Sequence, residues 1–178
     1  SPESGVEIID SDYNNFTIIN ASSNKIGINL DRTSAYNRIA NSTINSNAQQ
    51  GIYLVRTTNT YIYNNLFNNS KNIKIAGNSY NEFNKTKTSG TNIIGGSNLG
   101  GNFWTNPVAS GYSDKCADSD EDGICDSAYT IATNDVDYLP LSRADSTAPT
   151  IAIFSPVNNT YVNGNVTLRT NATDNLGI

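Results

Sequence analysis

Hydrophobic residues recur about every 22 positions through the first hundred residues, and this period limits the possible folds more than any other feature. One row is Phe16, Ile39, Ile62 and Phe83. A second row is Val6, Ile28, Ile52, Ile73 and Ile93, and a third follows it two residues later at Ile8, Leu30, Leu54 and Ile75. Because a spacing of two places side chains on one face of a strand, each repeat is expected to contain short β-strands.

This pattern predicts an all-β fold, a right-handed parallel β-helix of four to five coils of about 22 residues each. Equivalent residues of successive coils would lie above one another, with the Ile rows inside. Asn14, Asn37, Thr60 and Asn81 would form a hydrogen-bonded row at a turn. Gly27 and Gly51 each precede a hydrophobic pair, and we expect a tight bend there. A leucine-rich repeat has a similar period, but its Leu/Asn consensus is missing.

The composition excludes several classes of function. The chain has 11 Lys and Arg against 16 Asp and Glu, a net charge of −5 and no basic cluster, which argues against a nucleic-acid partner. It contains no His and no Met, so catalysis by imidazole and metal binding by imidazole or thioether are excluded. No hydrophobic run approaches the roughly 20 residues of a transmembrane helix.

Three phrases carry a resemblance to a known family: Gly51-Ile-Tyr-Leu54, Asn59-Thr-Tyr-Ile-Tyr-Asn-Asn65 and Gly100-Gly-Asn-Phe-Trp104. They resemble the NosD-type right-handed β-helix found in archaeal surface-layer and cell-surface proteins, especially of methanogens. The resemblance covers about residues 1–142. The family is often described as copper-binding and periplasmic, but the soft ligands that copper prefers are missing here, so that property is not expected.

The predicted organisation has four parts. Residues 1–104 form the β-helix, and 105–142 form a cap, with Trp104 as a lid over the last hydrophobic layer. Residues 143–150 are a linker. Residues 151–178 are a partial immunoglobulin-like β-hairpin with Asn163-Gly164 at its turn. Two strands cannot bury the core of a sandwich by themselves.

An acidic loop at 118–126 predicts a Ca²⁺ site. Its ligands would be the carboxylates of Asp118, Asp120, Asp122 and Asp126 and the backbone carbonyl of Ile124, with Gly123 at the turn. The loop resembles those of dockerins and thrombospondin repeats, because the Glu that ends an EF-hand loop is replaced by Tyr129. Asp114, Asp135 and Asp137 are expected to assist. The alternative is a solvated acidic turn.

Two further features indicate an extracellular or cell-surface location. Cys116 and Cys125 bracket the acidic loop, and we expect a disulfide between them if the protein is exported; in a reducing compartment they would be free thiols. Eight Asn-x-Ser/Thr sequons are candidates for glycosylation: Asn15, Asn20, Asn41, Asn68, Asn84, Asn158, Asn165 and Asn171.

These observations favour a non-enzymatic structural or interaction protein of a cell-surface layer, sheath or filament. Its partners would be other copies of itself, other surface proteins or glycans, and the C-terminal strands are candidates for strand addition to a neighbour. The alternative is a carbohydrate-binding or carbohydrate-active module of the polysaccharide lyase or epimerase kind. Asp10, Asp12 and Asp31 are the acids to test for catalysis, and Tyr53, Tyr61 and Tyr63 the candidates for sugar contact.

Overall fold

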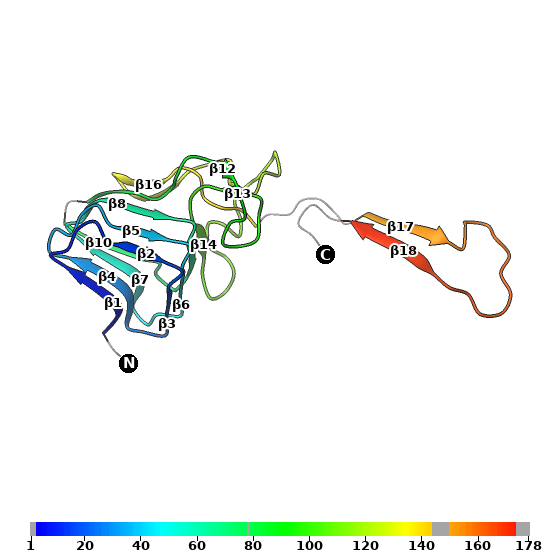
Figure 1. The fold of residues 1–178 in the computed structure, drawn as a ribbon, viewed down its shortest axis with the longest axis horizontal. Coiled ribbons are helices and arrows are strands. Elements are labelled where there is room, and N and C mark those ends of the chain that lie inside the picture. Colours follow the sequence, from blue (N-terminus) through cyan, green and yellow to red (C-terminus); the bar gives the residue numbers. More distant parts are fainter. Residues whose placement is uncertain (1–2, 78, 144–149, 174–178) are drawn as a thin grey trace. The chain divides into compact units, whose positions relative to one another are not determined.

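The computed structural model describes residues 3–77, 79–143 and 150–173. The chain divides into two compact units, residues 1–144 and 145–178. The first unit is a stack of β coils (Figure 1, blue to green), and the second is a β-hairpin. Most of the predicted linker lies outside the described residues.

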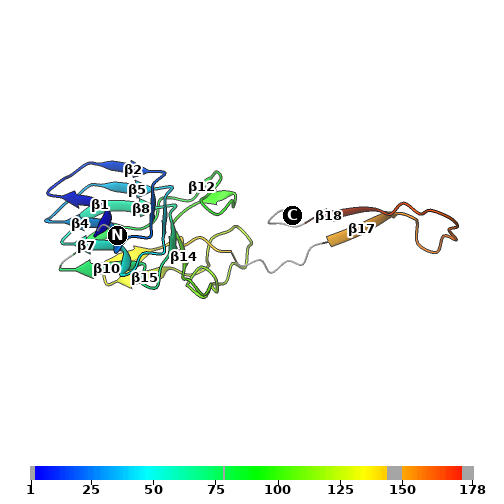
Figure 2. The ribbon, with the colours of Figure 1, turned by 90° about the horizontal axis from the view of Figure 1, so that it is seen from below.

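The first unit is a parallel β-helix, as the repeat predicts. One sheet stacks β1 (Ser4–Ile9), β4 (Ile26–Asp31), β7 (Gln50–Val55) and β10 (Ile73–Ala76). The second stacks β2 (Asn15–Thr17), β5 (Arg38–Ala40), β8 (Thr58–Tyr63) and β11 (Tyr80–Glu82). The third stacks β3 (Asn20–Ser22), β6 (Thr43–Asn45), β9 (Leu66–Asn68) and β14 (Phe103–Thr105). Figure 2 shows β1, β4, β7 and β10, and likewise β2, β5 and β8, in successive layers. The handedness of the coil stays a prediction.

The strand register confirms the hydrophobic rows. Val6 pairs with Ile28 and Ile28 with Ile52, while Ile39 stands between Phe16 and Ile62. The interior of the coils is fully buried at Ile28, Leu30, Ile39, Ile44, Ile52, Leu54, Ile62, Phe67 and Phe83. Each such side chain contributes roughly 1.5–3 kcal/mol to folding, so the stacked rows are the main source of stability.

The predicted place of Ile93 in the second row is wrong. The fourth coil carries an insertion between β11 and β14, which contains the antiparallel pair β12 (Thr88–Ser89) and β13 (Asn98–Leu99). Ile93 lies in this insertion and packs against a separate cluster of Phe103, Ile124 and Leu141. The even spacing of the row therefore ends at Ile73, although another Ile occurs about one period later.

Gly27 and Gly51 lie within β4 and β7, so the predicted tight bend is wrong as well. A Cβ at Gly27 would stand 2.5 Å from the carbonyl oxygen of Gly51 and 2.8 Å from Nδ2 of Asn47. Glycine is therefore required at this position because the backbone lies close to that of the next coil and to a neighbouring Asn side chain.

Asn side chains form hydrogen-bonded ladders between coils at three corners. In each ladder the side-chain oxygen of one Asn accepts hydrogen bonds from the coil before it. Oδ1 of Asn37 accepts from the backbone N of Asn14 at 2.9 Å, and Oδ1 of Asn69 accepts from that of Asn47 at 2.9 Å. The third ladder runs from Ser42 through Asn65 to Asn102. These ladders explain why a chain with 29 Asn can have a dry core.

Two of the three ladders end in carboxylates at the far end of the stack, and the third ends at Asn72. At the far end β16 (Asp135–Asp137) adds in parallel to β11, and β15 (Tyr129–Ala132) pairs antiparallel with β16. Asp135 accepts from the backbone N of Asn81 at 3.0 Å, and Asp137 from that of Asn102 at 2.8 Å. An Asn must both accept and donate, whereas the last member of a ladder has no further coil to donate to. A carboxylate, which only accepts, fits this position.

Three equivalent corner residues adopt positive φ: Ile18 (59°), Asn41 (54°) and Asn64 (52°). Nδ2 of Asn64 donates to Oδ1 of Asn41 at 2.7 Å, but Ile18 has no such group and is 84% exposed. The left-handed conformation costs a typical L-residue about 1–2 kcal/mol, and Asn tolerates it better. We therefore expect Ile18→Asn to raise the free energy of unfolding by about 1 kcal/mol.

Urea unfolding monitored by circular dichroism measures this effect. The matched control is Ile9→Asn, which changes another exposed Ile, in β1, with no positive φ to relieve. That variant is expected to be neutral or destabilised. Equal stabilisation of the two variants would show that lost surface hydrophobicity, not backbone strain, is responsible.

The second unit contains the predicted antiparallel hairpin, formed by β17 (Thr150–Ser155) and β18 (Arg169–Thr173). The returning strand begins at Arg169. Ile151, Ile153 and Phe154 are each at least 60% exposed, because a two-stranded sheet has no second layer. The immunoglobulin-like identity of this unit stays a prediction, and residues 174–178 lie outside the described residues.

Candidate functional site

The acidic loop brings together three of the five predicted calcium ligands. One carboxylate oxygen from each of Asp118, Asp120 and Asp126 lies within 4.8 Å of the others. Asp118 is buried, and its oxygens accept from the backbone N of Asp122 at 3.1 Å and of Gly123 at 2.9 Å. Gly123 has a φ of 81°, which permits the turn. The disulfide between Cys116 and Cys125 closes the loop, as expected for an exported protein.

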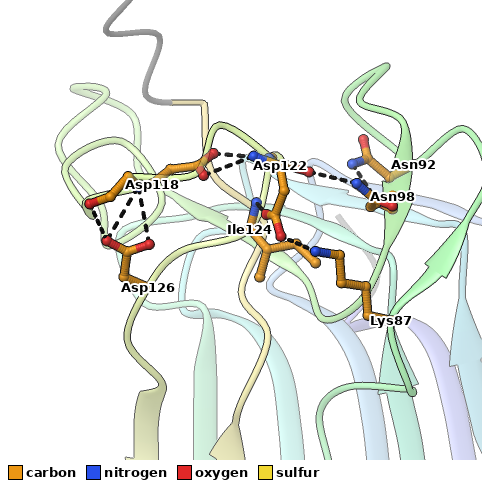
Figure 3. A network of polar contacts seen from close by, with 9 residues as sticks. Lys87, Asn92, Asn98, Asp118, Asp122, Ile124 and Asp126 are labelled. Atoms are coloured by element: carbon orange, nitrogen blue, oxygen red, sulfur yellow. Dashed lines mark hydrogen bonds and ion pairs between the residues drawn. The ribbon is translucent and has the colours of Figure 1, made fainter.

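Asp122 is not among these converging carboxylates, and the backbone carbonyl of Ile124 stays a predicted ligand. Figure 3 shows the Lys87 ammonium at the Asp122 carboxylate, with which it forms an ion pair. The other oxygen of Asp122 accepts from the backbone N of Ile124 at 2.8 Å. The Ile124 side chain packs with Phe103 and Leu141 and so anchors the loop to the cap.

The charges in the loop are only partly compensated. Burial raises the pKa of Asp118, and the neighbouring carboxylates of Asp122 and Asp120 raise it further. Hydrogen bonds from Ser119 lower the pKa of Asp126. Ca²⁺ binds carboxylate oxygens at about 2.3–2.6 Å, so ligand atoms on opposite sides of one ion stand about 5 Å apart. The spacing and the hard oxygen donors of this group therefore fit a calcium ion.

The three acids expected to assist are used elsewhere, so that expectation is wrong. Asp114 accepts from Oγ1 of Thr105 at 2.6 Å and from the backbone N of Gly111 at 2.8 Å. Asp135 and Asp137 are the buried ends of two of the Asn ladders. Asp135 and Asp137 are far in sequence from Asn81 and Asn102, so the sequence alone did not indicate this role.

Asp137 is a buried carboxylate at the end of the stack. Besides Asn102, the indole Nε1 of Trp104 donates to it at 2.8 Å and the backbone N of Leu139 at 3.1 Å. Burial raises the pKa of Asp137 to about 7, although these N–H donors favour the charged form. No ion pair to it occurs within the described residues.

The acidic residues considered for catalysis make structural contacts in the first two coils. Asp10 forms an ion pair with Arg32 at 3.7 Å, and Asp12 accepts from the backbone N of Ala35 at 2.7 Å. Asp31 accepts from the backbone N of Arg32 at 2.6 Å. Their carboxylates therefore hold turns and adjacent coils, which does not favour a catalytic pair.

The three tyrosines considered for sugar contact are partnered by charged neighbours. The Lys74 ammonium lies 4.5 Å from the ring centroid of Tyr53, and Tyr63 accepts from Nε of Arg38 at 2.8 Å. A hydrogen bond with Glu82 raises the pKa of Tyr61. These tyrosines therefore belong to a row of paired side chains on the outside of the coils, and they do not form an open surface for a sugar.

The structure places the sequons in different settings. Asn15, Asn20, Asn41, Asn158, Asn165 and Asn171 are exposed. Asn68 is half-buried in β9, and Oδ1 of Asn84 accepts from the backbone N of Tyr138 at 3.1 Å. The six exposed sequons are therefore the better candidates for glycosylation.

The end of the stack also contains an aromatic group that sequence reasoning found only in part. Trp104 is 1% exposed and stacks on Phe67 with ring centroids 4.5 Å apart, which confirms its role as a lid. The ring centroid of Tyr129 lies 5.2 Å from that of Trp104 and 4.8 Å from that of Tyr112. A cavity of about 300 Å³ opens beside these rings. The repeat gave no signal for it, because Tyr112 and Tyr129 lie after the periodic region.

Comparison with known proteins gives one match. A family model described as "Periplasmic copper-binding protein (NosD)" matches residues 1–109. No curated protein and no solved structure matches the chain. Within the described residues, no helix is long and hydrophobic enough to cross a membrane.

Copper, named in that description, does not fit the residues of this chain. The chain has no His and no Met, and both Cys are joined in the disulfide. Copper prefers imidazole, thiolate and thioether ligands, whereas the acidic loop offers hard carboxylate oxygens. Copper chemistry is therefore not carried over to this protein.

Proposed function

The chain belongs to the NosD family, and on this premise we propose that it is a non-enzymatic, extracellular structural and interaction module of a cell-surface layer, sheath or filament, stabilised by calcium. We include glycosylation at the exposed sequons and an archaeal origin in this proposal. Its partners are other copies of itself, other surface proteins or glycans.

The observation that carries the proposal is where the polar groups of the β-helix are used. The side chains of Asn14, Asn65 and Asn69 bond to adjacent coils, and so do those of Asp10 and Asp12. The result is a column of coils whose polar side chains join one coil to the next, which suits a structural element. Electron microscopy of native material tests the proposal. A lattice, sheath or filament containing this protein supports it, and isolated soluble particles contradict it.

The calcium part of the proposal has a separate test. Calcium at 100 times its dissociation constant is expected to raise the free energy of unfolding by about 2.7 kcal/mol. Asp120→Asn is expected to abolish the increase, because it removes one of three converging carboxylates. Thermal unfolding with calcium and with a chelator measures both effects.

The matched control for this test is Glu7→Gln, which removes an exposed carboxylate from β1, far along the sequence from the loop. It should respond to calcium as the unmodified chain does. Stabilisation that survives Asp120→Asn, or no stabilisation at all, would leave the loop as an acidic turn held by Lys87.

For assembly, we propose that the β17–β18 hairpin adds to a sheet of a neighbouring copy. Its exposed Ile151, Ile153 and Phe154 support this, because two strands alone cannot bury them. Such a head-to-tail contact generates open filaments. Light scattering over a range of concentrations, with and without residues 146–178, tests it. An unchanged monomer mass in both samples rules it out.

A further inference from the structure

Two neighbouring cavities at the end of the stack share one wall. The first, of about 300 Å³, is lined by Trp104, Tyr112 and Tyr129 together with the polar side chains of Asn69, Ser70, Lys71, Asn72 and Asn106. The second, of about 380 Å³, is lined by Lys115 and again by Gly111, Tyr112 and Tyr129. Their size is at the lower end of the roughly 300–1,000 Å³ of small-molecule sites, which suits one sugar ring in each.

Gly111 allows the wall between the two cavities to lie close to β14. A Cβ at this position would stand 2.3 Å from the carbonyl oxygen of Trp104 and 2.6 Å from Cα of Thr105. Asp114 fixes the same turn by accepting from the backbone N of Gly111. Both cavities therefore have a preformed backbone, so that binding requires little ordering of the loop.

Several hydrogen-bond donors around these cavities have no partner among the residues that the structure describes. The Tyr129 hydroxyl makes no hydrogen bond to another described residue, whereas the Tyr112 hydroxyl donates to the carbonyl of Ser127 at 2.8 Å. Burial raises the pKa of Tyr129, so its hydroxyl remains a neutral donor. Neither Lys71 nor Lys115 forms an ion pair within residues 3–77 and 79–143.

The residues that line the two cavities differ in charge from the chain as a whole, although the Asp114 carboxylate lies behind Thr105 and Gly111 of the first lining. Acidic residues outnumber basic ones by 16 to 11 in the chain, yet neither lining contains an Asp or Glu. Each lining has a Lys instead. Aromatic rings offer a hydrophobic face, amides and hydroxyls offer hydrogen bonds, and ammonium groups attract an anion. This combination matches a ring with a hydrophobic face, several hydroxyls and a carboxylate.

We propose that these cavities bind two adjacent rings of a negatively charged polysaccharide of the uronic-acid class. The Tyr129 ring lies between the two sugar positions, and Lys71 and Lys115 each pair with a carboxylate of the polymer. The site binds the polymer without cleaving it, because no acidic side chain lines it. This inference rests on the proposed function only for the extracellular setting, and it does not require the calcium loop.

Intrinsic fluorescence provides a direct test, because Trp104 is the only Trp of the chain and lines the first cavity. The full chain is titrated with a trimer of galacturonic acid and, in parallel, with the neutral galactose trimer of the same linkage. Loss of a charge-assisted hydrogen bond weakens binding about tenfold. The neutral trimer, Lys71→Gln and Lys115→Gln are each expected to show a loss of this size.

Lys25→Gln is the matched control, because it removes a Lys that belongs to neither lining. It should leave the affinity for the acidic trimer unchanged. The proposal is overturned by equal affinity for the two trimers, by an equal loss in Lys25→Gln, or by the absence of binding. Asp120→Asn separates this proposal from the calcium site. The variant should bind the acidic trimer normally, whereas a lost affinity would show that calcium, not the Lys pair, holds the carboxylates.

Discussion

Asp137→Ala is expected to lower the free energy of unfolding by about 3–5 kcal/mol at pH 5. The substitution leaves two buried donors, the backbone N of Asn102 and Nε1 of Trp104, and the half-buried backbone N of Leu139 without an acceptor. The same atoms join a ladder, the lid and the cap, so the last layer of the stack should loosen as a unit. Urea unfolding followed by Trp fluorescence measures the loss directly.

The pH dependence of stability provides an independent signature of Asp137. Its folded-state pKa of about 7 is above the ordinary value of 3.8, so its carboxyl favours folding most strongly below pH 4. This contribution is lost as the pH rises through 7. A shift of about three pKa units corresponds to about 4 kcal/mol. The stability of the unmodified chain relative to Asp137→Asn should fall by up to that amount between pH 4 and pH 8.

Asp10→Ala is the control for both measurements, because it removes an exposed carboxylate whose ion pair with Arg32 is worth at most about 1 kcal/mol. Its stability should follow that of the unmodified chain across the pH range. If Asp137→Asn and the unmodified chain showed parallel pH profiles, the pKa of Asp137 would be the same in the folded and unfolded states, and the burial argument would be wrong.

The repeated part of the fold could be predicted because its determinants are close in sequence and occur several times. A Val or Ile every 22 residues defines which residues stack, and the observed register places Ile28 between Val6 and Ile52. Where the hydrophobic pattern is weak in one repeat, the other repeats still define the period. The turn row at Asn14 and Asn37 was predictable for the same reason.

The cap could not be predicted in detail because each of its contacts occurs once and joins distant residues. Asn81 meets Asp135 across 54 positions, and Asn102 meets Asp137 across 35. The insertion that carries Ile93 interrupts the period, and although it holds five of the 13 Gly of the chain, its length and contacts do not follow from that enrichment. Gly27 was misread because close approach between coils and a tight bend favour the same residue.

In the candidate metal loop, too, the local features could be predicted and the long-range contacts could not. The alternation of Asp118, Asp120 and Asp122 and the turn at Gly123 are local, so the sequence could indicate an acidic loop and its disulfide. The position of Lys87 depends on the fold of the fourth coil, and it diverts Asp122 into an ion pair. A ligand pattern in sequence therefore identifies which groups are available, while long-range packing decides which of them converge.

Asn65→Ala is expected to lower the free energy of unfolding by about 3–4 kcal/mol. The Asn65 side chain accepts from the backbone N of Ser42 at 3.0 Å, and it donates to the carbonyl of Ile39 at 3.0 Å and to Oδ1 of Asn102 at 3.0 Å. All four residues are buried. Alanine leaves these groups unpaired where water cannot replace the lost bonds, so the cost exceeds that of an ordinary hydrogen bond.

Asn45→Ala tests whether the ladder, rather than Asn in general, produces this stability. Asn45 lies on β6 in the same stack, is half-buried, and its side chain makes no hydrogen bond within the described residues. Its replacement should change the free energy of unfolding by less than about 0.5 kcal/mol. If Asn65→Ala lowered the free energy of unfolding as little as Asn45→Ala, the Asn ladders would contribute little, and the stacked Ile rows alone would hold the coils together. A large loss confined to Asn65→Ala would establish the ladders as a second, polar core of the β-helix.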